Sequence, residues 1–305
     1  PKRAIVDASE RELGRLDVRA GDLFVATAWW TATVARRLEK DRARMFGGKL
    51  PFVYVIQDDE PHFYPAGAKS ELAEETYRDG DDMIAVINSE ELYLHMTEKH
   101  RLARAYCLPY AMNTAIREAL RPIPREPIIL AYARPSVARN AFELVCAGLR
   151  LWQIRDPIRA SRWQIRLLGE SFPEELIAPL RNVRIEAKLD LAAGADRLGR
   201  ASVGVSLMVS PHPSYPPLEM AEAGMTTVVN AHAGKDLRRR FDDVVSLDRL
   251  TAETVADAIE IAVARRDPML GALHGPTAPR ALDGTWTLPD GPALAEALSR
   301  AWAEA

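Results

Sequence analysis

Two arginines stand five residues apart directly after a short apolar run of this chain. The run 128–132 is followed by Arg134 and Arg139, and a helical pattern begins just beyond them. A strand that ends at a helix N-terminus leaves amides that favour an anion, and guanidinium groups add bidentate bonds to phosphate oxygens. The loop therefore suits a diphosphate. The alternative is that Ser136 or Asn140 caps the helix while the arginines pair with surface acids.

A second loop, residues 210–220, holds polar side chains on a backbone stiffened by four prolines. The last of these prolines predicts the first turn of a helix. Glu219 in that turn could accept two ribose hydroxyls, and the amides around Ser214 and Tyr215 could take a phosphate, with His212 beside them. The alternative is that Glu219 is only a favourable charge at a helix N-terminus and His212 a turn residue.

A third loop, residues 57–65, interleaves acids with aromatic rings. Carboxylates bind carbohydrate hydroxyls, and the apolar faces of sugars stack on rings, so this loop predicts an acceptor-sugar site. An acidic cluster could instead bind a metal. The candidate acceptor residues are Gln57, Asp58, Glu60, Phe63 and Tyr64.

Several motifs of other enzyme classes are missing from the sequence. It contains no G-x-G-x-x-G after an apolar run, no Walker loop, no G-x-S-x-G elbow and no H-E-x-x-H, which argues against the common dehydrogenases, NTPases and hydrolases. The triplet Asp79-Gly80-Asp81 matches the D-x-D of metal-dependent transferases, but it precedes its strand, where a turn is the better interpretation. We expect no metal and no cofactor.

Short apolar runs alternate with amphipathic helical stretches, which is typical of an α/β chain with parallel sheets covered on both faces. In such sheets ligands bind at the carboxyl ends of strands, where all three loops fall. A proline-rich break at 121–127 predicts two Rossmann-like domains, 1–123 and 124–285. Residues 286–305 predict a C-terminal helix that could pack back on the first domain. That domain is short, and a truncated N-terminus would explain it.

The composition is that of a globular protein. With 305 residues, 48% of them hydrophobic, and a net charge of -3, nothing favours nucleic-acid binding. Cys107 and Cys146 form no metal or disulfide framework, which fits a cytoplasmic protein. No apolar run is long enough to predict a transmembrane helix. The arginine-rich segments 36–44, 150–166 and 238–240 could contact acidic headgroups at the inner membrane face, which would make the protein peripheral. Solvated helix faces are the simpler interpretation of these segments.

Long blocks of the sequence carry a family resemblance. They are GDLFVATAWWTA, FVYVIQDDEPHFYP with LAEETY, ILAYARPSVARNAFEL and SLMVSPHPSYPPLEMAEAGMTTVVN, spread over most of residues 21–250. They resemble the GT-B glycosyltransferases of the retaining family four, and more narrowly the bacterial rhamnosyltransferases of surface-glycan and rhamnan synthesis. Arg134 and Arg139 match that family's G-R-x4-K element, with arginine in place of lysine. Glu219 matches the second glutamate of its E-x7-E element, whereas the first falls at Pro211.

The resemblance implies a GT-B fold, two Rossmann-like domains with parallel sheets facing across a cleft. It also implies metal-independent transfer with retention, from a nucleotide-diphosphate sugar, with dTDP-L-rhamnose as first guess, to a glycan or lipid-linked glycan. Arg134 and Arg139, with Lys188, would neutralise the leaving diphosphate. Asp58 or Glu60 would orient the acceptor hydroxyl. Because the first glutamate is missing, two alternatives stay open: a nucleotide-sugar-binding protein without turnover, and a GT-B-shaped nucleotide-sugar epimerase.

Overall fold

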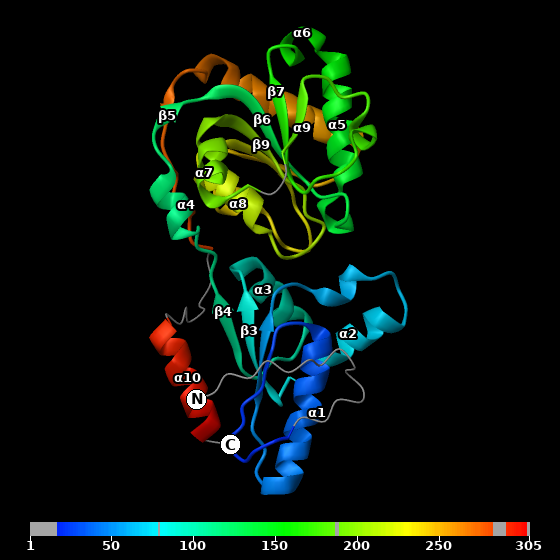
Figure 1. Cartoon of the computed structure of the whole chain (residues 1–305), viewed down its shortest axis with the longest axis vertical. Helices are drawn as coiled ribbons and strands as arrows, with labels where there is room; N and C mark the ends of the chain where they lie inside the picture. Colours follow the sequence, from blue (N-terminus) through cyan, green and yellow to red (C-terminus); the bar gives the residue numbers. More distant parts are fainter. Residues whose placement is uncertain (1–16, 79, 187–188, 283–290, 304–305) are drawn as a thin grey trace. The chain divides into compact units, whose positions relative to one another are not determined.

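The computed structural model describes residues 17–78, 80–186, 189–282 and 291–303 (Figure 1). The chain divides into a first unit, Pro1–Pro109 with Thr285–Ala305, and a second unit, Tyr110–Gly284. Each unit contains its own parallel sheet with helices packed against it. The predicted α/β class with two Rossmann-like halves is thereby confirmed.

The first unit is built on four parallel strands in the order β1-β2-β3-β4. Aromatic side chains of β2 and the helices α1 to α3 bury one face of this sheet. On the other face Val53, Ile84 and Val86 pack against Leu294 and Leu298 of the C-terminal helix α10. The elements are β1 Val25–Ala26, α1 Trp29–Phe46, β2 Phe52–Ile56, η1 Glu60–Phe63, α2 Ala68–Arg78, β3 Met83–Asn88, α3 Glu90–Lys99, β4 Ala105–Leu108 and α10 Gly291–Ala303.

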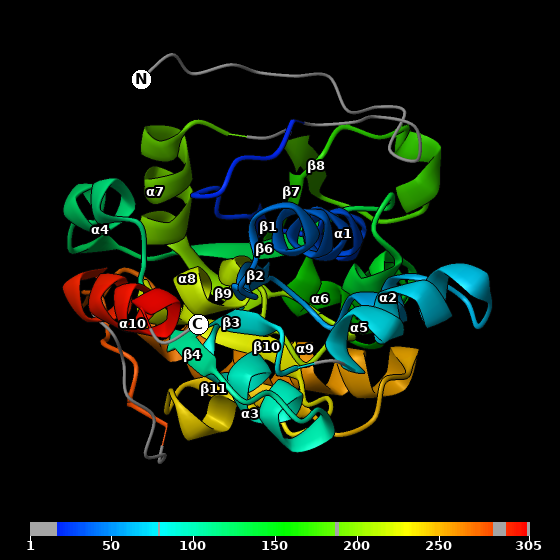
Figure 2. The same ribbon diagram turned by 90° about the horizontal axis from the view of Figure 1, so that it is seen from below.

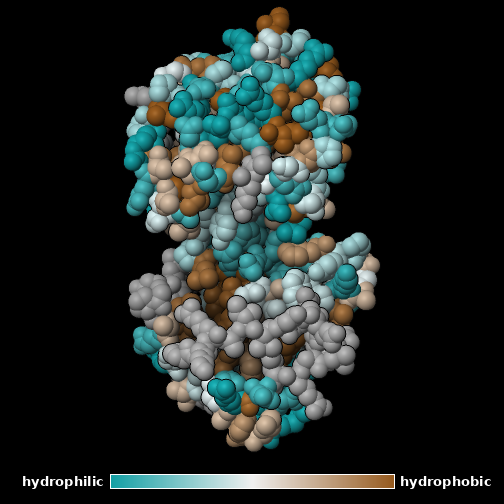
Figure 3. Space-filling view, viewed as in Figure 1, coloured by the Kyte–Doolittle hydropathy of each residue, from teal (hydrophilic) through white to brown (hydrophobic). Residues whose placement is uncertain are grey.

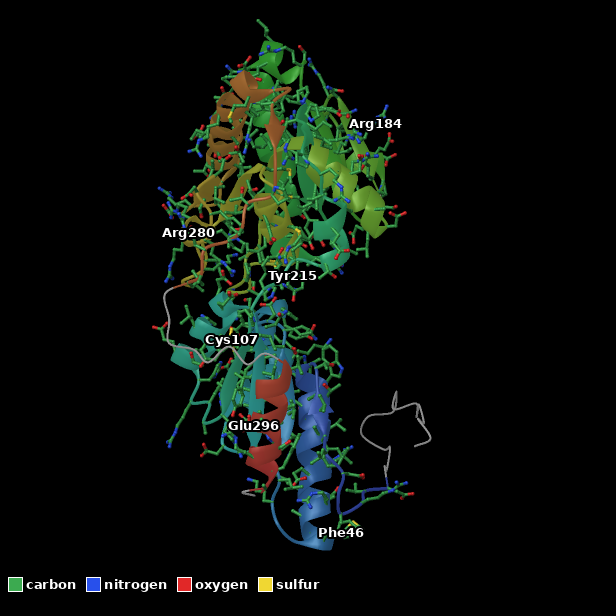
Figure 4. All side chains as sticks on the ribbon, turned by 90° about the vertical axis from the view of Figure 1, so that its left-hand side faces the viewer. Phe46, Cys107, Arg184, Tyr215, Arg280 and Glu296 are labelled. Carbon is green, nitrogen blue, oxygen red and sulfur yellow. The ribbon has the colours of Figure 1, made fainter. Side chains whose placement is uncertain are left out.

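Helix α10 belongs to the first unit although it lies at the far end of the sequence. Its Trp302 donates from the indole Nε1 to the carbonyl oxygen of Pro51 at 3.0 Å. Figures 1 and 4 show the helix, with Glu296 on it, beside the first sheet. The C-terminal helix therefore buries one face of the first sheet.

The second unit holds six parallel strands in the order β11-β10-β9-β6-β7-β8. Helices α5 and α9 cover one face, and α4, α7 and α8 cover the other (Figures 1 and 2). The elements are α4 Thr114–Ala119, β5 Ile123–Pro124, β6 Glu126–Ala133, η2 Ala138–Asn140, α5 Phe142–Arg155, α6 Pro157–Ala160, β7 Gln164–Gly169, η3 Glu174–Ile177, β8 Val183–Glu186, α7 Leu191–Arg200, β9 Ala201–Val205, α8 Tyr215–Glu222, β10 Thr226–Asn230, η4 Leu237–Arg239, β11 Val244–Leu247, α9 Ala252–Arg266, η5 Asp267–Met269 and β12 Leu273–His274.

Strand β6 starts the sheet at its centre, with β7 on one side and β9 on the other. The chain winds outward from β6 to β8 and then returns to β9 on the other side of β6, so the loops after β6 and β9 lead to opposite faces of the sheet. Ligands of open parallel sheets bind at such a switch point. Two of the three loops singled out from the sequence, those at 133–140 and 210–220, follow β6 and β9.

The border between the units differs from the one expected at 123–124. It lies between Pro109 and Tyr110, because Ile116 and Leu120, in and just after α4, belong to the core of the second unit. Arg117 of the same helix donates to the buried carboxylate of Glu222 at 2.8 Å. Packing thus assigns α4 to the second unit, whereas the prolines after it suggested a later break.

The arginine-rich segments are largely engaged in ion pairs. Arg36 lies 2.8 Å from Asp82, and Arg238 lies 2.8 Å from Asp248. In the segment 150–166, Arg159 pairs with Glu260 and other acids. Figure 3 shows apolar side chains scattered among hydrophilic ones on the visible face of the second unit. Among the described helices, none is long and apolar enough to cross a membrane.

Candidate functional site

A cavity of about 470 Å³ opens at the carboxyl ends of β6 and β7, between α7 and α8. Its size is within the range of small-molecule sites, which combine apolar walls with a few polar groups. A larger hollow of about 730 Å³ lies along the edge strand β8, but it contains no residue from the loops that the sequence singled out. The smaller cavity is lined by Ile116, Tyr132, Arg134, Leu168, Gly169, Glu170, Leu189, Asp190, Leu191, Gly194, Leu198, Pro216, Glu219 and Met220.

On one side of this cavity the loop after β6 surrounds a carboxylate. Ser136 donates to Glu170 twice, from its amide at 2.8 Å and from its hydroxyl at 2.6 Å. The Nε of Arg134 lies 3.7 Å from the same carboxylate. The hydrogen bonds from Ser136, and then the charge of Arg134, lower the pKa of Glu170. An amide, a hydroxyl and a guanidinium that converge on one carboxylate show that this loop can hold an anion.

Gly169 explains how Glu170 comes so close to that loop. Its φ of +135° is favoured only by glycine, and a Cβ there would lie 2.6 Å from the carbonyl oxygen of Ala133. The ends of β6 and β7 can therefore touch. Glu170 was not predicted as a site residue; the glycine before it, at the end of the apolar run 163–168, was the available sequence signal.

Glu219 faces the same cavity from α8. This helix begins at Tyr215, two residues before the expected start, so Glu219 lies in its second turn and not in its first. Burial, and then the charge of Glu222, raise the pKa of Glu219. The structure thus brings Arg134 and Glu219, which are 85 residues apart in the sequence, to one cavity.

The loop before α8 is held by its own histidine. His212 is buried, and its ring Nδ1 accepts a hydrogen bond from the backbone N–H of Ser214 at 3.0 Å. The backbone N–H of His212 donates to the hydroxyl of Ser210 at 3.1 Å. Burial, and then the charges of Lys235 and Arg139, lower the pKa of His212 to about 4. The ring is therefore neutral at pH 7 and carries its proton on Nε2.

This arrangement changes what the start of α8 can offer an anion. The N–H of Ser214, which the sequence suggested for phosphate, donates to the histidine ring. Pro216 and Pro217, at the second and third positions of the helix, have no N–H to donate. Tyr215 opens the helix, and its ring meets His212 edge to face with centroids 5.8 Å apart. Cationic side chains contribute positive charge near this loop.

Two cationic side chains supply that charge, and one of them was not predicted. Arg139 lies in η2, whose backbone is tied to the β9 loop because Val209 donates to the carbonyl oxygen of Arg139 at 2.8 Å. Lys235, after β10, is 3% exposed and donates from Nζ to the carbonyl oxygen of Met208. A lysine in a glycine-containing turn just after a predicted strand was the only sequence signal for it. Lys188, the second basic group expected here, lies outside the described residues, as does Asp79.

In the first unit, Asp59 organises the loop after β2. Its fully buried carboxylate accepts hydrogen bonds from His95 at 2.9 Å and from Lys99 at 3.2 Å, and His62 lies 3.0 Å away. Burial alone would raise the pKa of Asp59, but the bond from His95 and the charges of Lys99 and His62 lower it to about 2. Asp59 was not among the predicted site residues, because its partners His95 and Lys99 lie 36 and 40 residues away in the sequence.

The same carboxylate belongs to a group that could ligate a metal ion. Asp59, Glu74 and His100 offer ligand atoms within 4.8 Å of one another. Lys99 lies between two of them, 3.2 Å from Asp59 and 3.0 Å from Glu74. An ammonium group already balances these carboxylates, so the cluster has the charge pattern of an ion-pair network.

Glu60 lies at the start of α1. Its Oε2 accepts the N–H of Trp29, the first residue of that helix, at 2.6 Å, where a negative charge is favourable. The indole of Trp29 donates to the hydroxyl of Tyr64 at 3.0 Å, and the Gln57 amide donates to the carbonyl oxygen of Thr27 at 2.8 Å. These contacts fasten the loop to the β1–α1 turn.

The five predicted acceptor residues therefore differ in accessibility. Asp58 and Glu60 are buried, Gln57 is exposed, and Phe63 and Tyr64 are partly exposed. An oxygen of Asp58 accepts the amide of the next residue at 2.9 Å. The surface open to a sugar at this loop is thus formed by the amide and the two rings, with the carboxylates behind them.

Comparisons with known proteins agree with this architecture. Residues 127–260 match the family described as WsaF, C-terminal domain, and residues 1–90 match WsaF, N-terminal domain. The O-antigen biosynthesis protein RfbC of Myxococcus xanthus is 32% identical over 212 residues, which are 69% of this chain. The chain spans 16% of the length of that relative.

Solved structures show the same fold at low sequence identity. Sucrose-phosphate synthase from Thermosynechococcus elongatus has a TM-score of 0.59 at 14% identity, over 81% of this chain and 65% of its own. Trehalose-6-phosphate synthase OtsA has a TM-score of 0.57 at 11% identity, over 83% and 67%. TarM of S. aureus, in a complex that contains UDP, has a TM-score of 0.52 at 13% identity, over 72% and 45%.

Proposed function

Because this chain belongs to the GT-B glycosyltransferases and carries the N- and C-terminal domains of the WsaF family, we propose that it transfers a sugar from a nucleotide-diphosphate donor to a glycan acceptor during surface-glycan synthesis. The observation that carries the proposal is the cavity of about 470 Å³ at the switch point, with Glu219 on one wall and Arg134 on another. The O-antigen function in the name of the relative RfbC supports a surface glycan as product.

The cavity suits the nucleoside half of the donor. Its apolar walls, which include Leu168, Leu191 and Leu198, would pack against the base. Glu219 would accept the ribose hydroxyls, because a carboxylate can accept two hydrogen bonds at once. Arg134, which already attracts a carboxylate, would bind the diphosphate.

In the proposed reaction the acceptor oxygen forms a bond to the anomeric carbon while the bond from that carbon to the phosphate oxygen breaks. The electron pair of the broken bond leaves with the nucleoside diphosphate, which takes up the proton of the acceptor hydroxyl. Arg134 and Arg139 stabilise the charge that develops on that oxygen. Since side chains supply this charge, no metal is required. Following the family resemblance, we propose dTDP-L-rhamnose as donor and retention at the anomeric carbon. His212, with its proton on Nε2, would offer a neutral donor to the transferred sugar.

We propose that the acceptor glycan binds the loop at 57–65 of the first unit. The partly exposed rings of Phe63 and Tyr64 would stack on sugar faces, and Gln57 would bind hydroxyls. Of the two buried acids, Asp58 remains the candidate for orienting the acceptor, because Glu60 contacts the start of α1. A glycan or lipid-linked glycan could bring this surface to the membrane without any spanning helix.

A screen of thermal shifts with dTDP, UDP and GDP tests the donor half, and stabilisation by dTDP alone would support the proposed nucleotide. Glu219→Gln should weaken binding of that nucleotide about tenfold or more, because a charge-assisted hydrogen bond is worth about 1.5–3 kcal/mol. Glu174→Gln, in the hollow along β8, is the matched control and should leave binding unchanged.

Turnover tests the transfer itself. Arg139→Ala should reduce sugar transfer severely with the fold retained by circular dichroism, and unchanged turnover would contradict the assignment. Tight nucleotide binding with neither transfer nor donor hydrolysis would indicate a binding protein. Conversion of the donor sugar without any acceptor would indicate an epimerase.

A further inference from the structure

Lys235 is a buried cation that the proposed reaction has so far not used. Its side chain is 3% exposed, and its Nζ donates to the carbonyl oxygen of Met208 in the loop after β9. An ammonium group carries three donors, and burying it is unfavourable unless polar or anionic groups surround it. A buried ammonium group at the carboxyl end of a parallel sheet is a candidate for binding an anionic ligand.

The backbone holds Lys235 in a defined position. His232 and Lys235 exchange hydrogen bonds of 3.0 and 2.9 Å across a tight turn. Between them Ala233 and Gly234 both have positive φ, +46° and +83°, as the tightest two-residue turns require. Asn230 clamps the facing loop, since its side chain accepts the N–H of Met208 at 2.7 Å and donates to its carbonyl oxygen at 3.1 Å.

Lys235 also shares its surroundings with a second cation. Apart from burial, the influences on the pKa of His212 are the charges of Lys235 and Arg139, both positive. The neighbouring acid, Asp236, is directed elsewhere, because it accepts from Arg238 at 2.7 Å and caps η4. The space around His212 is thus positively charged while the histidine itself stays neutral.

The topology explains why the two cations converge. Strands β6, β9 and β10 are neighbours in the sheet, in the order β10-β9-β6, and all are parallel. Their carboxyl ends therefore lie along one edge. Arg139 comes from the loop after β6, Lys235 from the turn after β10, and His212 from the β9 loop between them. Opposing cations on either side of a loop are a suitable arrangement for a phosphate.

We propose that Lys235 is a further cation of the diphosphate site, which acts with Arg134 and Arg139 on the phosphate that leaves with the nucleoside. This assignment rests on the proposed function. When the bond between the anomeric carbon and the phosphate oxygen breaks, the oxygen keeps the electron pair. The ammonium group stabilises the resulting charge by a hydrogen bond and keeps its own proton.

The test compares nucleotides that differ by one phosphate. Lys235→Met keeps the aliphatic stem and removes the charge. By calorimetric titration with dTDP and dTMP, we expect this variant to bind dTDP about tenfold more weakly, with dTMP affinity changed less than about threefold. Sugar transfer should fall with the dTDP affinity. Lys235→Arg, which restores a cation, should recover part of the lost affinity.

Two controls separate this binding function from a purely structural one. Arg238→Ala removes an exposed cation three residues away and should alter neither affinity. Nuclear magnetic resonance of the histidine ring should show the pKa of His212 rising in Lys235→Met, because one of its two positive neighbours is gone. An equal loss of dTDP and dTMP binding, or full dTDP affinity in a folded variant, would overturn the assignment of Lys235. Failure of the unmodified protein to bind dTDP, UDP or GDP would instead overturn the proposed function.

Discussion

Replacing Asp59 by asparagine should destabilise the first unit by about 2 kcal/mol at pH 7. The pKa of this buried carboxyl is about 2 against an ordinary 3.8, and each unit of pKa corresponds to about 1.4 kcal/mol. Because the pKa is lowered, the stabilisation is complete above pH 3.8 and is lost as the pH falls through about 2. Asparagine keeps the shape of the side chain but removes the charge that holds His95 and Lys99.

Calorimetry in steps from pH 7 to pH 2 measures this effect, and it resolves the units if they unfold separately. We expect a decrease in Tm of roughly 5–12 °C at pH 7, shrinking as the pH approaches 2. The matched control is Glu74→Gln, which removes the half-exposed partner of the same Lys99 and should cost less than about 1 kcal/mol. Equal effects of the two variants, or a difference that does not change with pH, would refute the reasoning.

Three further substitutions test other parts of the structure. Glu60→Gln should lower stability by about 1 kcal/mol in thermal unfolding, because the charge at the Trp29 amide is lost; lost turnover with unchanged Tm would instead support a function at the acceptor. Glu219→Gln should raise Tm at pH 8 and make no difference below about pH 4.5, since burial raises the pKa of Glu219 and its charge is unfavourable above that pKa. Gly148→Ala should cost about 1–3 kcal/mol by urea unfolding, because the new Cβ would lie 2.3 Å from Val255; an unchanged midpoint would show that α5 and α9 can move apart.

Much of the fold could be predicted because local patterns of apolar and polar residues determine the strands and helices. The apolar run at 128–132 becomes β6, and the helix expected after it is α5, Phe142–Arg155. In parallel sheets the carboxyl ends of strands share an edge, so loops rich in functional groups could be expected to meet. The structure does bring Arg134 and Glu219 to one cavity.

The predictions fell short where proline was used to infer boundaries. The run Arg121–Pro127 suggested the border between domains, but the packing of Ile116 moves that border to Pro109. The apolar run 203–209 forms a strand only to Val205, and the N–H of its last residue donates to the carbonyl oxygen of Arg139. The local sequence shows which residues are apolar, whereas the hydrogen-bond partners of the backbone amides decide where a strand ends.

The sequence by itself determined the α/β class, the alternation of strands and helices, and which loops carry acids, bases and rings, because these follow from periodicity and side-chain chemistry along the chain. Only the tertiary structure decided what each charged group contacts. Asp59 and Glu60 are adjacent in the sequence, yet Asp59 binds the side chains of His95 and Lys99, about 40 residues away, and Glu60 contacts the start of α1. Lys235 joins the surroundings of His212 because β9 and β10 are neighbours in the sheet. The energy of a charge depends on its burial and on its nearest partners, and folding alone brings those partners together.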